Sequence, residues 1–214
     1  MGGRLIESAK DVSGSARRSA LGKRAFDLFW SVPGLVVLAL PLVLVALLIK
    51  LSDGGPVFFR QERVGHRGRV FRLWKLRTMR ERAEREGPRL TVGMDPRITP
   101  VGGFLRRFKL DELPQLINVV RGEMSFVGPR PEVPEYVALY TAKQRAVLEL
   151  MPGITDPASI KYRHESELLA ESDDPVSTYT DRIMPDKVRM NLEYAQRASV
   201  LTDVGVILKT IFHL

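Results

Sequence analysis

The sequence of 214 residues contains no cysteine and only three histidines, His66, His164 and His213. Disulfide bonds and thiolate metal sites are therefore excluded, and a reducing compartment such as the cytoplasm is compatible with the chain. The histidines lack the short spacings that are typical of zinc ligands, so zinc chemistry is not expected. The chain also contains no internal repeat, which argues against a solenoid.

Negative charge is scarce in one part of the chain. Between Arg60 and Lys109 there are fifteen Lys and Arg residues but only five Asp and Glu residues. The whole chain has a formal net charge of +8. A basic excess of this size predicts an anionic partner, which could be nucleic acid, phospholipid or a nucleotide.

Charged residues are absent from the 22 residues between Leu28 and Ile49. This run is long enough for a helix to cross the hydrocarbon core of a bilayer, so we expect membrane insertion. Pro41, in the middle of the run, removes a backbone hydrogen bond and predicts a bend. Basic residues flank both ends of the run, so the charge distribution indicates no orientation of the segment across the membrane. Two topologies stay open, a kinked transmembrane helix and a re-entrant segment that enters and leaves by one face.

These patterns divide the chain into three parts. We expect residues 1–22 to be a mobile basic leader or a short surface helix, residues 23–51 to be the membrane segment, and residues 52–214 to form a domain outside the membrane. Most apolar residues follow helical spacing, and weak alternation on either side of Gly65–Gly68 predicts one hairpin. The expected fold class is mainly α with a small β-hairpin. Residues 203–214 are amphipathic and are expected to pack on the core or rest on the membrane surface.

Two adjacent carboxylates, Asp111 and Glu112, stand at a predicted helix start, because Pro114 is tolerated only in a first turn. A structural explanation is available: Asp would cap the helix and Glu would complement its dipole, together worth about 1–2 kcal/mol. The surrounding charge favours a second explanation. The basic residues near the pair are Arg106, Arg107, Lys109, Arg121 and Arg130.

Carboxylates among arginines suit the chemistry of phosphates. Such a pair can bind Mg²⁺ while phosphate oxygens and water complete the octahedron. Alternatively, one carboxylate can attack phosphorus and hold a covalent intermediate. Arg130 lies between two prolines in the segment Ser125–Pro131, which keeps it out of helical geometry and presents its guanidinium rigidly for an anion. The alternative is an arginine that covers a protein surface.

Four motifs occur in a fixed order along the chain, and a short fifth segment follows them. They are Lys23-Arg24-Ala25-Phe26-Asp27, the residues FRLWKLRTM at 71–79, LDELPQL at 110–116, SFVGPRP at 125–131 and PGIT at 152–155. With these motifs the chain resembles the bacterial monotopic phosphoglycosyl transferases, also called bacterial sugar transferases. The resemblance runs from Lys23 to about Gly153 and continues weakly to the C-terminus.

The resemblance implies a reaction at the cytoplasmic face of the bacterial inner membrane, catalysed by residues 52–214. A phosphosugar would pass from a nucleotide diphosphosugar, commonly a UDP-sugar, to polyprenyl phosphate. The products would be a polyprenyl diphosphosugar and UMP, formed through a covalent aspartyl-phosphosugar intermediate with Mg²⁺ as cofactor. This would be the first membrane step in the assembly of a glycan such as an exopolysaccharide or O-antigen.

The resemblance also implies roles for individual residues. Asp111 would be the nucleophile, and Asp111 with Glu112 would hold Mg²⁺. The implied phosphate contacts are Lys75, Arg77, Arg106 and Arg130. The apolar segment would be a re-entrant helix–break–helix with Pro41 as its break and Arg24 and Asp27 at the membrane interface. The implied fold is thus that of a monotopic membrane protein with amphipathic interfacial helices.

Two segments depart from the pattern of the family. Many members have Gly-Trp-Ala-Gln-Val where this chain has Asp156-Pro157-Ala158-Ser159-Ile160, which leaves the identity of the sugar open. An aspartate followed by aromatic residues is usual where this chain has Asn191-Leu192-Glu193-Tyr194, so Glu193 either replaces that aspartate or its role is absent.

The implied partners are a UDP-sugar, polyprenyl phosphate and the phospholipid bilayer, without nucleic acid; a homodimer stays open. Two other functions compete with this interpretation. One is a non-catalytic basic membrane protein that binds anionic lipid or nucleic acid through residues 60–109. The other is a Mg²⁺-dependent phosphohydrolase that uses the same carboxylates.

Overall fold

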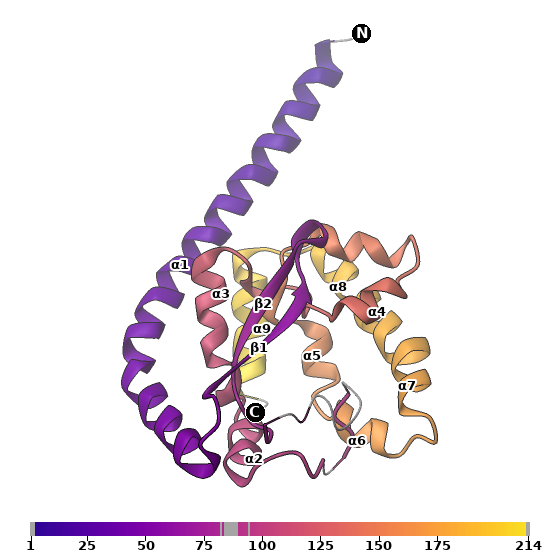
Figure 1. Ribbon diagram of the computed structural model, residues 1–214. Helices are drawn as coiled ribbons and strands as arrows, with labels where there is room; N and C mark the ends of the chain where they lie inside the picture. The colour runs from indigo at the N-terminus through magenta and orange to yellow at the C-terminus, as the bar shows by residue number, and fades with distance from the viewer. Residues whose placement is uncertain (1–2, 82, 84–89, 94, 213–214) are drawn as a thin grey trace.

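The computed structural model describes residues 3–81, 83, 90–93 and 95–212, with side chains described from Leu21 onward except Asp53. The C-terminal part of one long helix, α1 (Gly3–Asp53), packs along one side of a body made of shorter helices and two small sheets, and its N-terminal part projects beyond the body (Figure 1). The expectation of a mainly α fold with a small hairpin is confirmed.

The first sheet is the hairpin that the sequence predicts. Strands β1 (Phe58–Val64) and β2 (Val70–Leu76) pair antiparallel, with Val64 opposite Val70. A single 3₁₀ turn, η1 (His66–Gly68), connects them. Gly68 has a φ of 72°, a left-handed conformation that glycine adopts without steric cost. Burial increases along β2, and this places Leu73 and Leu76 in the core.

The central segment differs from the prediction in its helix type. Helix α2 (Pro100–Arg107) is followed by a 3₁₀ helix, η3 (Leu110–Gln115), then by α3 (Leu116–Arg121) and strand β3 (Ser125–Val127). The α-helix expected to start near Asp111 therefore starts at Leu116. Pro114 explains the shift, because it has no N–H to donate and its ring crowds the carbonyl four residues earlier.

The rest of the chain forms the far side of the body. Its elements are α4 (Pro134–Ala138), η4 (Gln144–Glu149), β4 (Gly153–Thr155), α5 (Pro157–Lys161), α6 (Glu165–Ala170), α7 (Pro175–Thr178), the π-helical turn η5 (Tyr179–Ile183), α8 (Met184–Ala195) and α9 (Val200–Phe212). The largest core cluster joins these helices to β1 and includes Val64, Val137, Leu169 and Ile183. In α9, Val206 faces the core whereas Leu201 and Phe212 are exposed, so the expected amphipathic tail is present.

Two glycines bring β3 and β4 together as a short parallel pair. A Cβ atom on Gly128 would lie 2.1 Å from the carbonyl oxygen of Met151, and one on Gly153 would lie 2.1 Å from the Gly128 nitrogen. Such distances are far below van der Waals contact. Both positions therefore require glycine, and the contact fixes the start of the Gly128-Pro129-Arg130 loop.

Helix α1 is continuous through both of its prolines, Pro33 and Pro41. The helix break expected at Pro41 is therefore absent, and Figure 1 shows the helix curving around the body rather than separating into two helices. Residues 3–22, for which we expected a leader or a short surface helix, form its first turns. The segment from Leu21 to Ser52 is long and apolar enough to cross a membrane, by length and composition alone.

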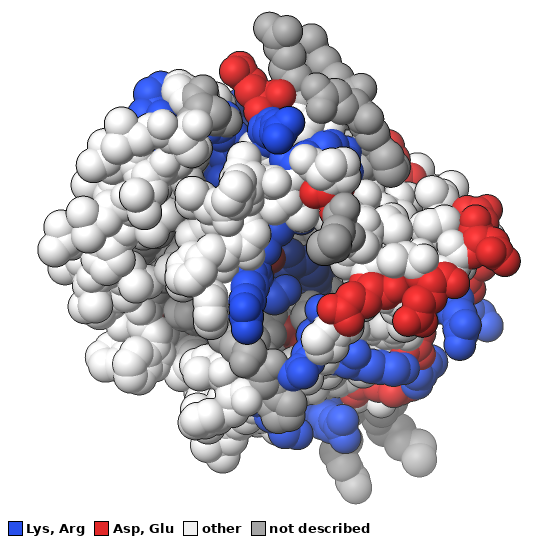
Figure 2. Space-filling view, turned by 90° about the horizontal axis from the view of Figure 1, so that it is seen from below, with Lys and Arg blue, Asp and Glu red and all other residues white. Residues whose placement is uncertain are grey.

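The two faces of α1 have different neighbours. Asp27, Ser31 and Ile49 are at most 4% exposed and point toward the body. The opposite face consists of exposed apolar side chains, among them Phe29, Trp30, Val36, Val37, Leu40, Leu44, Leu47 and Leu48. Seen from below, a broad surface without charged residues lies on the α1 side, next to a hollow where Lys and Arg side chains gather (Figure 2).

Arg24 and Asp27 in the first motif connect α1 to the elements beside it. Arg24 donates to the carbonyl oxygens of Val119 and Val120 in the last turn of α3, the latter at 2.7 Å. A positive charge at a helix C-terminus is favourable. The buried carboxylate of Asp27 accepts hydrogen bonds from the hydroxyl of Ser125 at 3.0 Å and the N–H of Phe126 at 3.1 Å, both in β3.

Lys23 holds the same strand from another side. Its ammonium donates to the carbonyl oxygen of Val127 at 2.8 Å and pairs with the buried carboxylate of Asp203 in α9. The hydroxyl of Tyr194 also donates to Asp203, at 2.7 Å. The Lys23–Asp27 motif is therefore a buried polar contact between α1 and the body. We call the side chains of Lys23, Arg24 and Asp27 the polar seat of α1.

Replacing Asp27 by Ala should destabilise the fold. The hydroxyl of Ser125 and the N–H of Phe126 would lose their acceptor inside the protein, which costs about 1–3 kcal/mol. Asp27→Asn retains an oxygen acceptor and should lose less. Thermal unfolding in detergent, with the exposed Glu171→Ala as control, measures the difference. Equal midpoints for Asp27→Ala and Glu171→Ala would contradict the role given to the polar seat.

Candidate functional site

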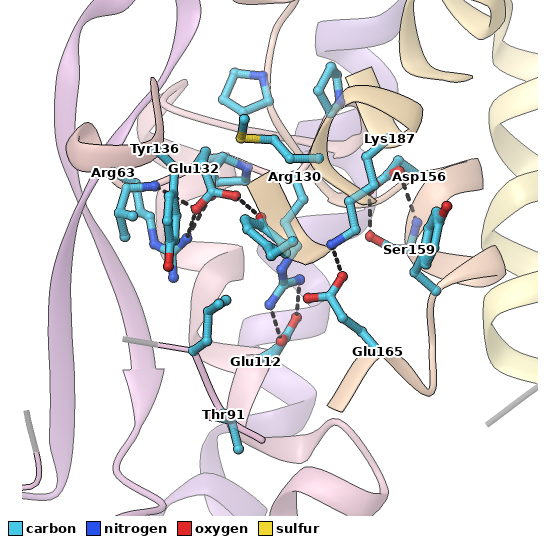
Figure 3. Close-up of a pocket in the computed structure, with 18 of the residues that line it drawn as sticks. Arg63, Thr91, Glu112, Arg130, Glu132, Tyr136, Asp156, Ser159, Glu165 and Lys187 are labelled. Atoms are coloured by element: carbon cyan, nitrogen blue, oxygen red, sulfur yellow. Dashed lines mark hydrogen bonds and ion pairs between the residues drawn. The ribbon is translucent and has the colours of Figure 1, made fainter. Parts of the chain in front are cut away.

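A cavity of about 580 Å³ lies between the hairpin, η3, the loop after β3, helices α4, α5, α6 and α8, and the turn η5. Its charged and polar lining includes Lys75, Arg106, Asp111, Glu112 and Arg130. These residues come from β2, α2, η3 and the loop that follows β3. A close-up of the cavity shows Arg130 reaching Glu112 near its centre (Figure 3).

Glu112 is fully engaged by two cations. The guanidinium of Arg130 binds its carboxylate with two hydrogen bonds of 2.5 and 3.1 Å, and the ammonium of Lys75 donates at 3.0 Å. Burial alone would raise the pKa of Glu112, but Arg130 and Lys75 together hold this pKa well below its usual range. Glu112 in turn raises the pKa of Arg130, whereas burial lowers the pKa of Lys75. Glu112 and Arg130 are therefore both charged at neutral pH.

Asp111 differs from its neighbour. It is 6% exposed, lines the cavity, and none of the described residues donates a hydrogen bond to its carboxylate. Burial raises the pKa of Asp111; the charge of Lys75 opposes this effect, and the negative charge of Glu112 adds to it. Asp111 is thus a buried carboxylate that is not committed to a structural partner.

The helix-capping explanation of the pair is wrong for this fold. The residue before η3 is Lys109, and no side chain caps the start of this helix among the residues that the structure describes. Lys109 has a φ of 55°, a left-handed conformation that is rare outside glycine. This turn reverses the chain between α2 and η3, so that Arg106 and Asp111, on its two sides, both face the cavity.

Arg106 is held by two hydroxyl groups. Its Nε donates to Thr78 at 2.8 Å and one terminal nitrogen donates to Thr91 at 3.3 Å. Burial lowers the pKa of Arg106, and the nearby Asp111 carboxylate opposes this effect. The guanidinium of Arg106 therefore lies at the cavity wall, close enough to the Asp111 carboxylate for an electrostatic interaction. Together with Lys75 and Arg130 it makes the cavity strongly cationic.

The structure brings together most of the residues singled out from the sequence. Asp111, Glu112, Lys75, Arg106 and Arg130 line one cavity. Arg77 does not belong to its lining, because its guanidinium packs over Gly55, where an added Cβ would lie 2.0 Å from an Arg77 nitrogen. Its expected phosphate contact has no support from this placement.

Arg24, Asp27 and Pro41 lie on α1, outside the cavity lining. The first two point into the body, as the polar seat, and are therefore placed differently from side chains that face a membrane surface. Their role at the membrane interface stays a prediction.

Sequence reasoning missed the second half of the cavity. Its side chains include Arg63, Glu132, Tyr136, Tyr179 and Lys187. Of these five residues, only Glu132 could have been indicated by the sequence, because it is a charged residue that directly follows the Pro-Arg-Pro segment. Residues 165–186 have the composition of surface loops and helix ends, so no local pattern indicates that Tyr179 faces a cavity.

The two segments that depart from the family pattern contact each other. Asp156 caps α5 by accepting hydrogen bonds from the nitrogens of Ala158 and Ser159 and from the Ser159 hydroxyl. The side-chain amide of Asn191 donates to the same carboxylate at 3.2 Å. An aspartate at position 191 would face Asp156 across this distance, so the two departures are compatible as a pair. Glu193 is exposed and paired with Arg189, away from the cavity.

A comparison with protein families agrees with the geometry. Residues 18–214 match the family described as "Bacterial sugar transferase". The chain belongs to this family. The family membership inferred from the four motifs, and with it the expectation of a transferase, is confirmed.

Three relatives illustrate the family. The chain is 37% identical to the exopolysaccharide production protein ExoY of Sinorhizobium fredii, over 89% of this chain and 84% of the relative. It is 41% identical to an undecaprenyl-phosphate glucose phosphotransferase of Komagataeibacter xylinus and 36% identical to the UDP-glucose:undecaprenyl-phosphate glucose-1-phosphate transferase of Escherichia coli. In both cases 89% of this chain is covered, but only 35% and 39% of the relative. The chain thus spans most of ExoY and little more than a third of the other two.

Replacing Asp111 by Asn should stabilise the protein at neutral pH. The folded pKa of Asp111 is raised, so ionisation at neutral pH opposes folding, and stability is lost as pH rises through this pKa. The gain of Asp111→Asn should therefore shrink as pH falls and vanish below about pH 4, near the pKa of an unfolded Asp. Thermal unfolding between pH 4 and 8, with the exposed Asp173→Asn as control, measures the effect. A gain that is largest at low pH would contradict the assignment.

Proposed function

We propose that this protein transfers a phosphosugar from a UDP-sugar to polyprenyl phosphate, at the cytoplasmic face of the bacterial inner membrane. The observation that carries the proposal is the Asp111 carboxylate, which is buried, uncommitted and surrounded by Lys75, Arg106 and Arg130. Relatives named as undecaprenyl-phosphate glucose phosphotransferases and exopolysaccharide production proteins support the substrate classes.

In the proposed first step, a carboxylate oxygen of Asp111 attacks the phosphorus that carries the sugar. A P–O bond forms to Asp111, the P–O bond to the nucleoside monophosphate breaks, and UMP leaves with that bond's electrons. Glu112 is unsuited to this attack, because both of its oxygens are bound by Arg130 and Lys75. The same cations stand where they can bind phosphate oxygens, for which the planar guanidinium of Arg130 is the best match.

In the second step, a phosphate oxygen of the acceptor attacks the same phosphorus. The new P–O bond gives the polyprenyl diphosphosugar, and the bond to Asp111 breaks, which regenerates the carboxylate. Ordinary carboxylates are weak nucleophiles in water. The loss of solvent around Asp111, which also raises its pKa, makes the ionised group more reactive.

A Mg²⁺ ion fits the donor set through Asp111. Such an ion is commonly bound by one or two carboxylates, while phosphate oxygens and water supply its other ligands. Within the described part of the chain, no group of three or more His, Cys, Asp or Glu residues could hold a metal by itself. Asp111 is available as a ligand, whereas Glu112 would have to share its oxygens with Arg130 and Lys75. When bound, the ion would neutralise charge on the diphosphate.

The packing of α1 supports a topology in which the helix stays on one face of the bilayer, through its curvature rather than through a break at Pro41, over a spanning topology. The apolar stretch from Leu28 to Ile49 is about 33 Å long as a helix. The body contacts α1 along this whole length, at the polar seat, at Gly34 next to Leu116, and at Ile49 next to Leu105. In a spanning orientation, charged elements of the body would share the depth of the hydrocarbon core, which is unfavourable.

The arrangement suits an acceptor that is itself a lipid. The exposed apolar face of α1 continues beside the hollow where Lys and Arg gather (Figure 2). Phe104 and Phe108 in and after α2 are also exposed, two residues on either side of Arg106. A phosphate on a polyprenyl chain could reach the cavity while its chain stays among apolar side chains.

Asp111→Asn should abolish transfer in a donor screen that follows UMP release from UDP-sugars with Mg²⁺ and polyprenyl phosphate. Glu112→Gln should lower the rate by about 10²-fold or more, because the positioned cations lose their partner. Arg145→Gln, in the exposed turn η4, should behave as wild type.

Failure of every plausible donor to release UMP, or full activity of Asp111→Asn, would overturn the proposal. Sugar phosphate released to water, with none found on the lipid, would instead select a phosphohydrolase.

Because the chain has no cysteine, single cysteines can report its topology. Gly22→Cys has open space for its side chain, and Glu171→Cys lies on the body. In sealed inverted and right-side-out vesicles, a re-entrant α1 predicts labelling of both positions from the cytoplasmic side only. Labelling of Gly22→Cys from the periplasmic side would mean that α1 spans the bilayer.

A further inference from the structure

The cavity extends well beyond the groups that bind phosphate. Its volume of about 580 Å³ is in the range that holds a ligand larger than a diphosphate. The part beyond Arg130 is walled by Tyr136 from α4, Tyr179 from η5 and Lys187 from α8. We call these three side chains the tyrosine wall.

The tyrosine wall is built in layers. The rings of Tyr136 and Tyr179 lie 5.0 Å apart between centroids, at an angle of 52°. Tyr179 is 4% exposed and forms the inner layer, whereas Tyr136 is only partly buried. The ammonium of Lys187 lies 5.2 Å from the centroid of Tyr179 and forms an ion pair with Glu165. Tyr136 is therefore a supported aromatic face at the edge of the cavity.

The backbone at Tyr179 has a conformation that is common at functional sites. Tyr179 is the first residue of a π-helical turn between α7 and α8. Such turns are less favourable than α-helix and occur frequently at functional sites, where they redirect side chains. Here the turn buries both Tyr179 and Ile183, and the Tyr179 hydroxyl donates to the carboxylate of Glu132.

Two carboxylates around the wall, those of Glu132 and Asp156, are already bound by other groups of the protein. Glu132 accepts hydrogen bonds from Tyr179 and from the N–H of Val133, and pairs with Arg63. The carboxylate of Asp156 is occupied by α5 and Asn191. A sugar brings several hydroxyl groups, each of which needs a partner when it is buried. A flat aromatic ring needs fewer partners and gains from stacking.

We propose that the tyrosine wall binds the pyrimidine base of the donor nucleotide, with the base stacked on Tyr136. The inference rests on the proposed function, because it takes the phosphates to lie at Arg130 and Asp111. Glu132 is two residues from Arg130, about 7 Å along an extended chain, which leaves room for a ribose between phosphate and base. In Figure 3, Glu132 and Tyr136 lie together on one side of Glu112, and Thr91 lies on the opposite side of Glu112. The sugar would then extend away from the tyrosine wall.

Binding of UMP to the full-length protein in detergent, measured by isothermal titration calorimetry, tests the proposal. Tyr136→Ala should weaken UMP binding about tenfold or more, the loss expected for one stacked base. Tyr136→Phe keeps the ring and should stay within about twofold of wild type. Leu139→Ala, an exposed neighbour just after α4, is the matched control and should bind UMP as wild type does.

Ribose 5-phosphate and glucose 1-phosphate separate the base from the other parts of the donor. Neither contains a base, so Tyr136→Ala should leave their binding unchanged. Weaker binding of glucose 1-phosphate to Tyr136→Ala would mean that the wall holds the sugar, and this would overturn the proposal. So would UMP binding that is the same in Tyr136→Ala and wild type, or wild type that does not bind UMP.

The proposed function can fail separately from this inference. If UDP-sugars release UMP in wild type and Tyr136→Ala binds UMP normally, the transfer stands and the base site is wrong. If UMP binds through Tyr136 and no donor is turned over, the base site stands and the transfer reaction is wrong.

Discussion

The bidentate ion pair between Arg130 and Glu112 is the interaction on which the site depends. Charges are costly to bury unless they are paired and hydrogen-bonded, so Glu112 can occupy the interior only if Arg130 and Lys75 meet it there. This requirement joins η3, β2 and the loop after β3 in one geometry. Among the residues that the structure describes, the adjacent Asp111 has no hydrogen-bond donor of its own. Glu112 binds the two cations, and Asp111 faces the cavity.

Local patterns predicted the parts of the fold that local forces decide. The hairpin followed from alternation around a glycine turn, and the rigid Arg130 followed from its two prolines. Three of the four phosphate contacts that the family resemblance implied, Lys75, Arg106 and Arg130, line the cavity. Arg77 also stands in a motif, but it follows the last residue of β2, Leu76, and its guanidinium packs over Gly55 in the turn after α1.

Features that depend on distant segments left no local signal. The tyrosine wall joins Tyr136 to Tyr179, which is more than forty residues further along the chain, and the segment around Tyr179 has the composition of a surface loop. The contact between Asp156 and Asn191 could not be inferred from two separate departures in sequence. The 3₁₀ start of the central helix depended on how Pro114 was accommodated, which spacing does not reveal.

The polar seat gives α1 a second role besides its apolar surface. Its charged and polar groups bind backbone atoms at the end of α3 and along β3, and β3 leads directly into the loop that carries Arg130. The position of α1 is therefore coupled to the position of a guanidinium in the cavity.

This coupling means that the membrane segment is not an interchangeable anchor. A generic hydrophobic helix of equal length would bring the domain to the same surface but would present no partner to Ser125, Phe126 or Asp203. A soluble version made by deleting α1 would expose the same groups to water and loosen the strand that they hold. Protein engineers who wish to move this catalytic body to another scaffold have to transplant the face of α1 together with it.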